Sequence, residues 1–239
     1  MLILYRIYQF LIMMPLMIAA TLLAVVFTLA GCMLGGGYWW GYYPAKIWAR
    51  IFCALTLVRV TVHGRQNISP GRSYVFVANH QGAYDIFSIY GYLNHNFRWM
   101  MKRGLRSIPF VGYTCKIAKH IYVDNSSPAA TRATMEHAES VLSHGMSIVV
   151  FPEGARTFTG NMRPFKRGAF VLAREFSLPV VPITIQGSFE VLPRTKRLPH
   201  WGHITLTIHP AIEPEEGADH SLQHLADQSH QIIASTLTR

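Results

Sequence analysis

The sequence is poor in charge, in acidic residues and in cysteine. Only 14% of its 239 residues are charged, whereas soluble domains average about 25%. The three cysteines are scattered and include no Cys-x-x-Cys pair, which argues against a disulfide framework, a redox motif or a structural zinc site. Half of the residues are hydrophobic, which excludes an intrinsically disordered chain.

Charge is absent altogether from Ile7 to Ala45, a run of 39 residues. The most apolar part, Leu11 to Leu34, exceeds the length of about 20 residues that a bilayer-spanning helix needs. An aromatic cluster of the kind found at membrane interfaces follows, and the apolar core is too long for a signal peptide. We therefore expect residues 1–56 to form a membrane-anchoring helical region; a buried core helix is the alternative.

The path of this N-terminal region has two alternatives. A second apolar stretch begins at Pro44, and its charges Lys46 and Arg50 are four residues apart, so they share one face of a helix. The three glycines at 35–37 could supply a bend before it. The sequence is consistent both with a single membrane helix and with a helical hairpin that returns to the surface it entered.

Basic residues outnumber acidic ones by 22 to 12, which gives a net charge of +10. The stretch from His95 to His200 holds 15 of the basic and 6 of the acidic residues, a net +9. Such a surface could attract nucleic acid, anionic lipid or a phosphorylated substrate. One basic residue precedes the uncharged run and three soon follow it, so the positive-inside tendency predicts that the large domain faces the cytoplasm. We expect the inner membrane as the location.

Residues 57–239 alternate strand-like and helix-like patterns, which predicts an α/β domain with a mixed sheet flanked by helices. We expect the acidic stretch 213–219 to be a solvated loop. The expected strands are 57–63, 74–79, 97–102, 120–123, 147–152, 179–186 and 203–210, and the main expected helices are 83–93, 128–144 and 221–237.

A candidate catalytic base directly follows the second expected strand. His80 ends that strand, and Asp85 lies five positions later, near the start of the next expected helix. One turn of chain can bring the carboxylate to the imidazole, where it would fix the tautomer and leave the other ring nitrogen free as a base. Because this spacing is common by chance, a purely structural use of both residues remains open.

A second candidate site follows the strand at 147–150. Pro152 and Gly154 predict a turn at the end of this strand, where α/β domains place their ligands. The turn presents Glu153, Arg156 and Thr157, and the planar fork of arginine suits a phosphate. The alternative is an internal ion pair between the glutamate and the arginine.

Taken together, these segments resemble the 1-acylglycerol-3-phosphate acyltransferases of phospholipid synthesis. The resemblance covers about half of the chain and rests on four ordered blocks: NHQGAYD at 79–85, KHIYVDN at 119–125, FPEGART at 151–157 and LPVVPI at 178–183. Two positions depart from the usual pattern. Ala155 stands where the family has Thr or Ser, and Asn125 where it has Arg.

The resemblance implies a glycerolipid acyltransferase-like fold and a reaction. His80 would be the general base, oriented by Asp85, for transfer of an acyl group from acyl-CoA or acyl carrier protein. The acceptor would be the free sn-2 hydroxyl of lysophosphatidate, and the product phosphatidate. The hydroxyl attacks the thioester directly, so the missing Gly-x-Ser-x-Gly motif is expected.

The resemblance also implies a binding site for the glycerol phosphate, formed by Glu153, Gly154, Arg156 and Thr157. Lys102, which lies outside the four blocks, is the candidate for a second cation, and a backbone N–H near Gly154 is a candidate for stabilising the oxyanion.

Two other functions remain open. A related acyltransferase could use glycerol-3-phosphate or a lyso-aminolipid, and a non-enzymatic basic domain could bind membrane or nucleic acid. We expect the membrane bilayer rather than nucleic acid as partner. No cofactor is implied, and no metal is expected, because the twelve histidines show no recognisable ligand spacing.

Overall fold

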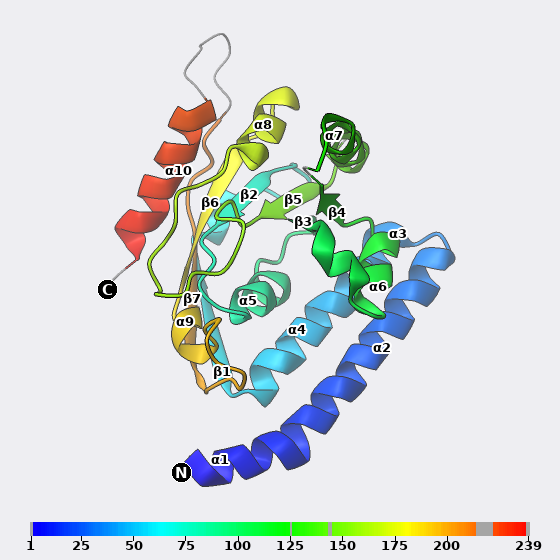
Figure 1. Cartoon of the computed structure of the whole chain (residues 1–239), viewed down its shortest axis with the longest axis vertical. Helices are drawn as coiled ribbons and strands as arrows, with labels where there is room; N and C mark the ends of the chain where they lie inside the picture. The colour runs from blue at the N-terminus through cyan, green and yellow to red at the C-terminus, as the bar shows by residue number, and fades with distance from the viewer. Residues whose placement is uncertain (1, 125, 143–144, 214–221, 238–239) are drawn as a thin grey trace.

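A single sheet organises the part of the chain that the computed structural model describes, residues 2–124, 126–142, 145–213 and 222–237. The sheet order is β1-β7-β6-β2-β5-β3-β4 (Figure 1). The strands are β1 Val58–His63, β2 Val75–Ala78, β3 Phe97–Lys102, β4 Ile121–Val123, β5 Ser147–Val150, β6 Val180–Gln186 and β7 Gly202–Ile208. Strands β2 to β6 are mutually parallel, whereas β7 is antiparallel to β6 and parallel to β1, which confirms the expected mixed sheet.

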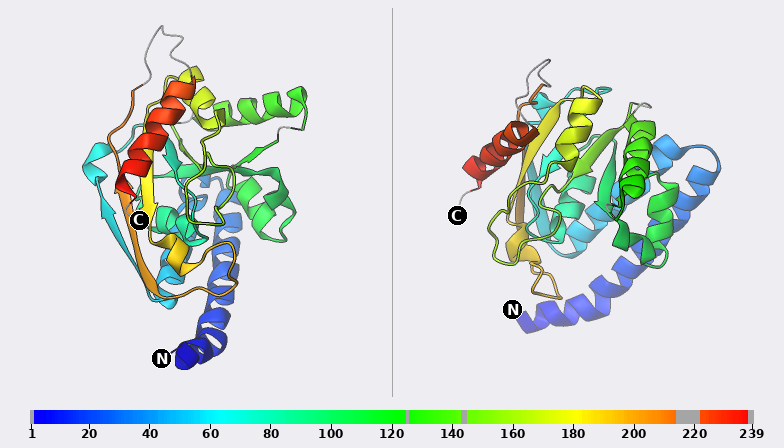
Figure 2. Two further views of the ribbon diagram at one scale, coloured as in Figure 1. Left: turned by 60° about the vertical axis from the view of Figure 1, so that its left-hand side comes forward. Right: turned by 45° about the horizontal axis from the view of Figure 1, so that its top comes forward.

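Helices cover both faces of this sheet (Figures 1 and 2). They are α1 Leu2–Tyr8, α2 Met14–Met33, α3 Gly37–Trp40, α4 Tyr43–Leu55, α5 Tyr84–Tyr92, α6 Val111–Ile117, α7 Pro128–Leu142, α8 Gly168–Glu175, α9 Ser188–Val191 and α10 Leu222–Thr236. A π-helical turn, η1 (Gln9–Met13), joins α1 to α2, and two 3-10 turns, η2 (Arg65–Asn67) and η3 (Arg103–Ser107), precede β2 and α6.

The alternation of side chains along the strands divides the core into two layers. In β2, Phe76 and Ala78 point into a cluster that includes residues of α4 and α5. Val75 and Val77 point into the other cluster, which α7, α8 and α10 complete. Because successive side chains of a strand leave on opposite faces, this fully buried strand needs apolar residues at every position.

The N-terminal region is a helical hairpin. Residues Leu2–Met33 form a continuous helix of 32 residues with a mean hydropathy of 2.6, long and apolar enough to cross a membrane. Its most apolar window is only 6% buried, so it is not the buried core helix of the alternative. Gly35, at φ +87°, allows the turn after it, and α4 then packs back along α2 (Figures 1 and 2).

The returning helix α4 belongs to the core as much as to the hairpin. Its Ala49 and Cys53 are fully buried in the cluster shared with α5. Arg50 Nε donates to the Gly91 carbonyl at 2.8 Å, near the end of α5, where a cation complements the helix dipole. The boundary that we expect between residues 56 and 57 therefore divides elements that pack together, and it stays a prediction.

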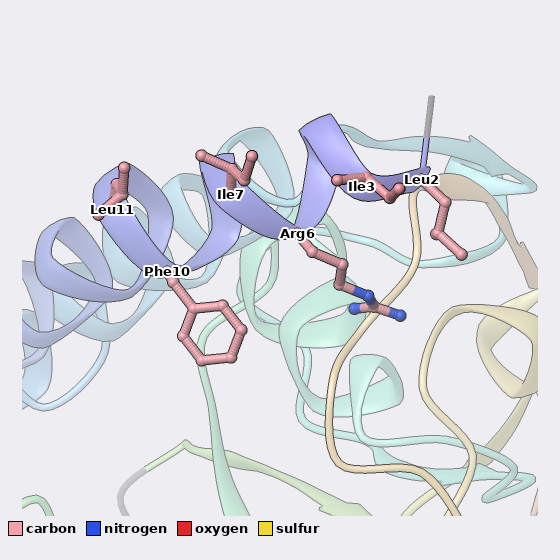
Figure 3. A pocket seen from close by; sticks show the side chains of 6 residues that line it. All are labelled: Leu2, Ile3, Arg6, Ile7, Phe10 and Leu11. Atoms are coloured by element: carbon pink, nitrogen blue, oxygen red, sulfur yellow. The ribbon is translucent and has the colours of Figure 1, made fainter.

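The helix α1 is tied to the domain by polar contacts. Tyr5 donates its hydroxyl to the Thr56 carbonyl at 2.9 Å, and Gln9 Nε2 donates to the Pro199 carbonyl at 2.8 Å. The remaining side chains of this end of the hairpin are mostly apolar and line a shallow pocket (Figure 3): Leu2, Ile3, Arg6, Ile7, Phe10 and Leu11.

Most expected elements lie within a few residues of their predicted limits. Ser127 caps α7 as its position before a proline suggests, because its hydroxyl accepts the Ala130 N–H at 3.1 Å. The short helices α6 and α9 were not predicted. The expected acidic loop at 213–219 lies almost wholly outside the described residues, as do Asn125, the C-terminal end of the helix expected at 128–144 and the first residue of the helix expected at 221–237.

Candidate active site

Three adjacent parallel strands bring the candidate residues to one edge of the sheet. In the register, Val150 of β5 lies opposite Val77 of β2 on one side and Met100 of β3 on the other. The residues that follow these strands therefore emerge at the same carboxyl edge, where α/β sheets bind ligands. The edge carries His80 after β2, the segment 151–157 after β5, and Lys102 at the end of β3.

The imidazole of His80 is held by Asp85. The distance from His80 Nδ1 to Asp85 Oδ2 is 2.7 Å, and the carboxylate is completely buried. A carboxylate accepts only, so the proton of the neutral ring lies on Nδ1. No described residue bonds to Nε2, which therefore remains available as a base.

The carboxylate of Asp85 is itself fixed by three further donors. The backbone N–H groups of Gln81 and Gly82 donate to Oδ2 at 2.7 and 2.9 Å. The hydroxyl of Ser188, at the start of α9, donates to Oδ1. Together with the imidazole, these contacts use both carboxylate oxygens and leave Asp85 a single orientation.

Gly82 permits the close approach that brings Ser188 to this network. A Cβ at Gly82 would lie 2.2 Å from the Ser188 carbonyl oxygen, which is sterically impossible without a shift of the backbone. The Ala83 N–H also donates to the Leu192 carbonyl at 3.0 Å. The loop after β2 is thus packed directly against α9, more than 100 residues away in sequence.

An aromatic stack supports the other side of the imidazole. The rings of His80 and Phe151 are nearly parallel, with centroids 3.9 Å apart and an interplanar angle of 7°. Phe151 in turn stacks on Trp99 of β3, with centroids 5.3 Å apart. The face of an aromatic ring attracts a cation, so Phe151 can stabilise the imidazolium that forms when His80 takes up a proton.

The described contacts of Glu153 are internal. Its buried carboxylate accepts the His80 N–H at 2.7 Å and the Arg163 N–H at 2.9 Å. Burial raises the pKa of Glu153, and the two N–H groups partly oppose this shift. Glu153 therefore joins the loop after β2 to the loop that precedes α8, and the ion pair with Arg156 considered from sequence is absent among the described residues.

Arg156 is a cation of this edge that no internal contact among the described residues uses. The described residues provide no hydrogen bond or ion pair for its half-buried guanidinium. Lys102, at the end of β3, is exposed and likewise has no acidic partner in the part of the chain described. Thr157 has a different position: it is buried, and its N–H donates to the His80 carbonyl at 3.0 Å.

Gly154 brings a third cation to the turn. Its φ of +74° favours glycine, and the position a Cβ would take lies 3.1 Å from Lys166 Nζ. The Gly154 N–H donates to the Phe151 carbonyl at 2.9 Å, so this amide is not free to stabilise an oxyanion. In the sequence, Lys166 counts only toward the positive charge of the stretch from His95 to His200. Sequence reasoning also missed Ser188 and the stacking role of Phe151.

The described residues contain no group of three or more histidine, cysteine, aspartate or glutamate side chains placed to hold a metal ion.

The chain is similar to known acyltransferases. The family model described as Acyltransferase matches residues 59–186. The chain is 31% identical over 200 residues to a 1-acyl-sn-glycerol-3-phosphate acyltransferase of Chlamydomonas reinhardtii, covering 82% of this chain and 58% of the relative. It is 29% identical over 200 residues to the protein of that name from Pseudomonas aeruginosa, covering 82% and 77% of the two chains.

The human relative, 1-acyl-sn-glycerol-3-phosphate acyltransferase alpha, is 31% identical over 172 residues, which are 72% of this chain and 61% of its own. The chain thus spans about half the length of several of the curated relatives it matches. Among solved structures, the 1-acyl-sn-glycerophosphate (LPA) acyltransferase PlsC from Thermotoga maritima is similar with a TM-score of 0.78 and 24% identity, covering 98% of this chain and 93% of that one. This last likeness concerns the fold.

A buried histidine, His120, contacts Trp99, the outer ring of this aromatic stack. His120 lies beside Trp99, whose backbone N–H donates to Nδ1 at 3.0 Å, while Nε2 lies 2.9 Å from the Tyr90 hydroxyl. An acceptor role for Nδ1 requires a neutral ring with its proton on Nε2. Burial, aided by the charge of Arg98, lowers the pKa of His120 from its usual 6.5 to about 3.

We predict that His120 makes the fold sensitive to acid. In the unfolded chain His120 binds a proton near pH 6.5, whereas in the folded protein it stays neutral down to about pH 3. The free energy of unfolding therefore decreases as the pH falls from 6.5 towards 3. The contribution is at most about 1.4 kcal/mol per pH unit. The measurement is the free energy of unfolding in detergent between pH 4 and 7.5. His120→Gln should flatten the curve below pH 6.5, whereas His63→Gln, at an exposed position, should not. Equal slopes in wild type and His120→Gln would contradict this role.

Proposed function

The chain belongs to the acyltransferase family, and from this premise we propose that it acylates the free sn-2 hydroxyl of lysophosphatidate, giving phosphatidate. The observation that carries the proposal is the His80–Asp85 pair at the sheet edge, with unpaired cations beside it. The similarity to relatives named 1-acyl-sn-glycerol-3-phosphate acyltransferase supports lysophosphatidate as acceptor.

In the proposed reaction, His80 Nε2 removes the proton of the acceptor hydroxyl as its oxygen attacks the thioester carbonyl carbon. The tetrahedral intermediate then expels the thiolate of acyl-CoA or of acyl carrier protein, which receives the proton back from the imidazolium. Asp85 stabilises the imidazolium through Nδ1 and does not itself need to accept a proton. A positioned base of this kind contributes about 10²–10⁴-fold to the rate.

The acceptor phosphate is proposed to lie between the cations of the two neighbouring strand ends. Arg156 offers a planar fork for two phosphate oxygens, and Lys166, beside Gly154, and Lys102, at the end of β3, add positive charge. Glu153, Gly154 and Thr157 support this arrangement by fixing the turn that carries Arg156. No cofactor is needed, because the thioester supplies the energy of the transfer.

We further propose that the hairpin associates the enzyme with the inner membrane, with the α/β domain on the cytoplasmic side. Only 6% of the most apolar window of the helix Leu2–Met33 is buried, and a bilayer removes its exposed apolar side chains from water. The lysophosphatidate acceptor and the phosphatidate product are amphipathic lipids that reside in the same bilayer. The site would then meet its substrate at the membrane surface.

The test of the proposed function is an acyl-transfer assay with purified full-length protein in lipid vesicles. Acyl-CoA and acyl carrier protein thioesters are each offered with lysophosphatidate, glycerol-3-phosphate and lysophosphatidylethanolamine. The account expects phosphatidate from lysophosphatidate as the fastest product by at least about tenfold. Equal rates with the amine-bearing acceptor, or no transfer to any acceptor, would overturn the assignment.

Replacing the proposed base should abolish turnover without loss of membrane association. We expect His80→Ala to lower kcat by at least about 10³-fold, because no other described side chain is placed to take the hydroxyl proton. Asp85→Asn should lower kcat by about 10²–10⁴-fold, since an amide can donate to Nδ1 and so favour the wrong tautomer. Vesicle flotation and the unfolding temperature serve as controls, and most of the activity surviving in folded His80→Ala would refute the mechanism.

Replacing the proposed phosphate ligand should act mainly on acceptor binding. Removal of a charge-assisted hydrogen bond is worth about 1.5–3 kcal/mol, so Arg156→Gln should raise KM for lysophosphatidate by about 10–100-fold. The KM for the acyl donor should change little. The matched control is Arg167→Gln, at an exposed position just before α8. A raised KM for the donor with an unchanged KM for lysophosphatidate would show that Arg156 serves the other substrate.

A further inference from the structure

The segment between β3 and β4 exposes an unusual number of large apolar side chains for the surface of an α/β domain. It consists of η3 and α6, which pack against each other, and we name residues 103–117 the η3–α6 segment. Five of its side chains are at least 41% exposed: Leu105, Ile108, Phe110, Val111 and Tyr113. Contiguous apolar surface of this kind marks an interaction site.

Positive charge surrounds these apolar residues. From residue 97 to residue 123 the chain contains no aspartate or glutamate. Five exposed cations border or interrupt the apolar surface: Lys102, Arg103, Arg106, Lys116 and Lys119. Arg103 pairs with Asp124 at 2.6 Å, and the others have no acidic partner among the described residues.

The segment is held in an ordered shape rather than left as a loose loop. A Cβ at Gly112 would lie 2.1 Å from the Arg106 carbonyl oxygen, so this glycine lets α6 pack tightly on η3. The Tyr122 hydroxyl donates to the Gly112 carbonyl at 2.8 Å and ties α6 to β4. Phe110, at φ +60°, adopts a backbone conformation that is costly for a large residue, and it presents a side chain that is 71% exposed.

The position of the segment connects the hairpin to the site. Helix α6 packs against α2 (Figures 1 and 2). Its exposed apolar side chains therefore lie beside a helix that also exposes many apolar side chains. At its other end the segment begins directly after Lys102, the last residue of β3 and the proposed phosphate cation. A surface that lies on the bilayer here would bring that cation to the level of the lipid headgroups.

We propose that the η3–α6 segment is a second membrane-contact element. Its apolar side chains enter the boundary between headgroups and acyl chains, and its cations bind anionic lipid headgroups. Because the hairpin packs on the domain, the two can tilt only together relative to the bilayer. A second contact outside the hairpin fixes that tilt and with it the position of the sheet edge. The inference rests on the proposed membrane-bound function and adds the surface that orients the site.

The charge of the η3–α6 segment favours a lipid bilayer over a second copy of this chain as the partner that covers it. Two copies that met through this segment would bring together the three cations of each segment and the lysines at 102 and 119 beside it, and Arg103 alone among these has an acidic partner within the part of the chain described, which makes the contact unfavourable. An anionic leaflet offers both the negative charge and the apolar interior that the segment lacks. We therefore commit to the lipid surface, and treat protein partners as outcomes of the test.

The test places the photo-crosslinker p-benzoylphenylalanine at position 110 of the full-length protein in vesicles of phosphatidylcholine and phosphatidylglycerol. The matched control carries it at Ala129, an exposed residue of α7, which covers the sheet face opposite α4. We expect a phospholipid adduct at position 110, detected by mass, in at least about tenfold excess over position 129. It should fall when phosphatidylglycerol is omitted.

Flotation of the vesicles separates the two levels of the proposal. Protein that fails to float refutes the membrane-bound function itself. Protein that floats but gives equal adducts at both positions refutes only the η3–α6 contact. A protein–protein adduct at position 110 would also overturn it, because it would identify a second copy or another protein as the occupant.

A kinetic arm uses a variant that leaves the site intact. The double substitution of Phe110→Ser and Tyr113→Ser should lower transfer to vesicle-embedded lysophosphatidate by about tenfold, because two apolar side chains no longer enter the interface. Transfer to a short-chain, water-soluble lysophosphatidate should stay within about twofold of wild type. Equal losses on both acceptors would indicate damage to the fold and contradict the membrane role of the segment.

Discussion

The buried carboxylate of Asp85 is the group on which the rest of the site depends. It is removed from water completely, and burial of a charge is tolerable only where hydrogen bonds replace the lost solvent. Two backbone amides, one serine hydroxyl and one imidazole provide those bonds. Because the partners come from the loop after β2 and from α9, the carboxylate fixes the position of both elements as well as the tautomer of His80.

The pairing of His80 with Asp85 could be predicted from sequence because both lie in one loop-to-helix turn, where five positions of spacing determine the geometry. The contribution of Ser188 could not, since it depends on β6 lying beside β2 in the sheet. The contacts of Glu153 could not be predicted from the sequence either. Its place in the FPEGART block suggests a ligand-facing side chain, whereas the carboxylate points inward to two backbone amides.

The hairpin and the sheet were predictable at different levels. Composition predicted the long apolar helix, and the glycines at 35–37 suggested the bend that the structure places there. Helix α6 was missed because its seven residues are too few for a clear helical periodicity, and because Phe110 precedes it in a conformation that few large residues adopt. A positive φ at a phenylalanine has no signature in the local sequence, because L side chains rarely adopt it.

The protonation of the His80 ring tests the central claim most directly. With ¹⁵N-labelled histidine in the full-length protein in detergent, the account predicts that neutral His80 carries its proton on Nδ1, with a strongly hydrogen-bonded N–H signal that disappears in Asp85→Asn. Nε2 should give the signal of an unprotonated nitrogen. A ring protonated on Nε2 in the wild type would contradict the account, because the nitrogen proposed as base would then already hold a proton.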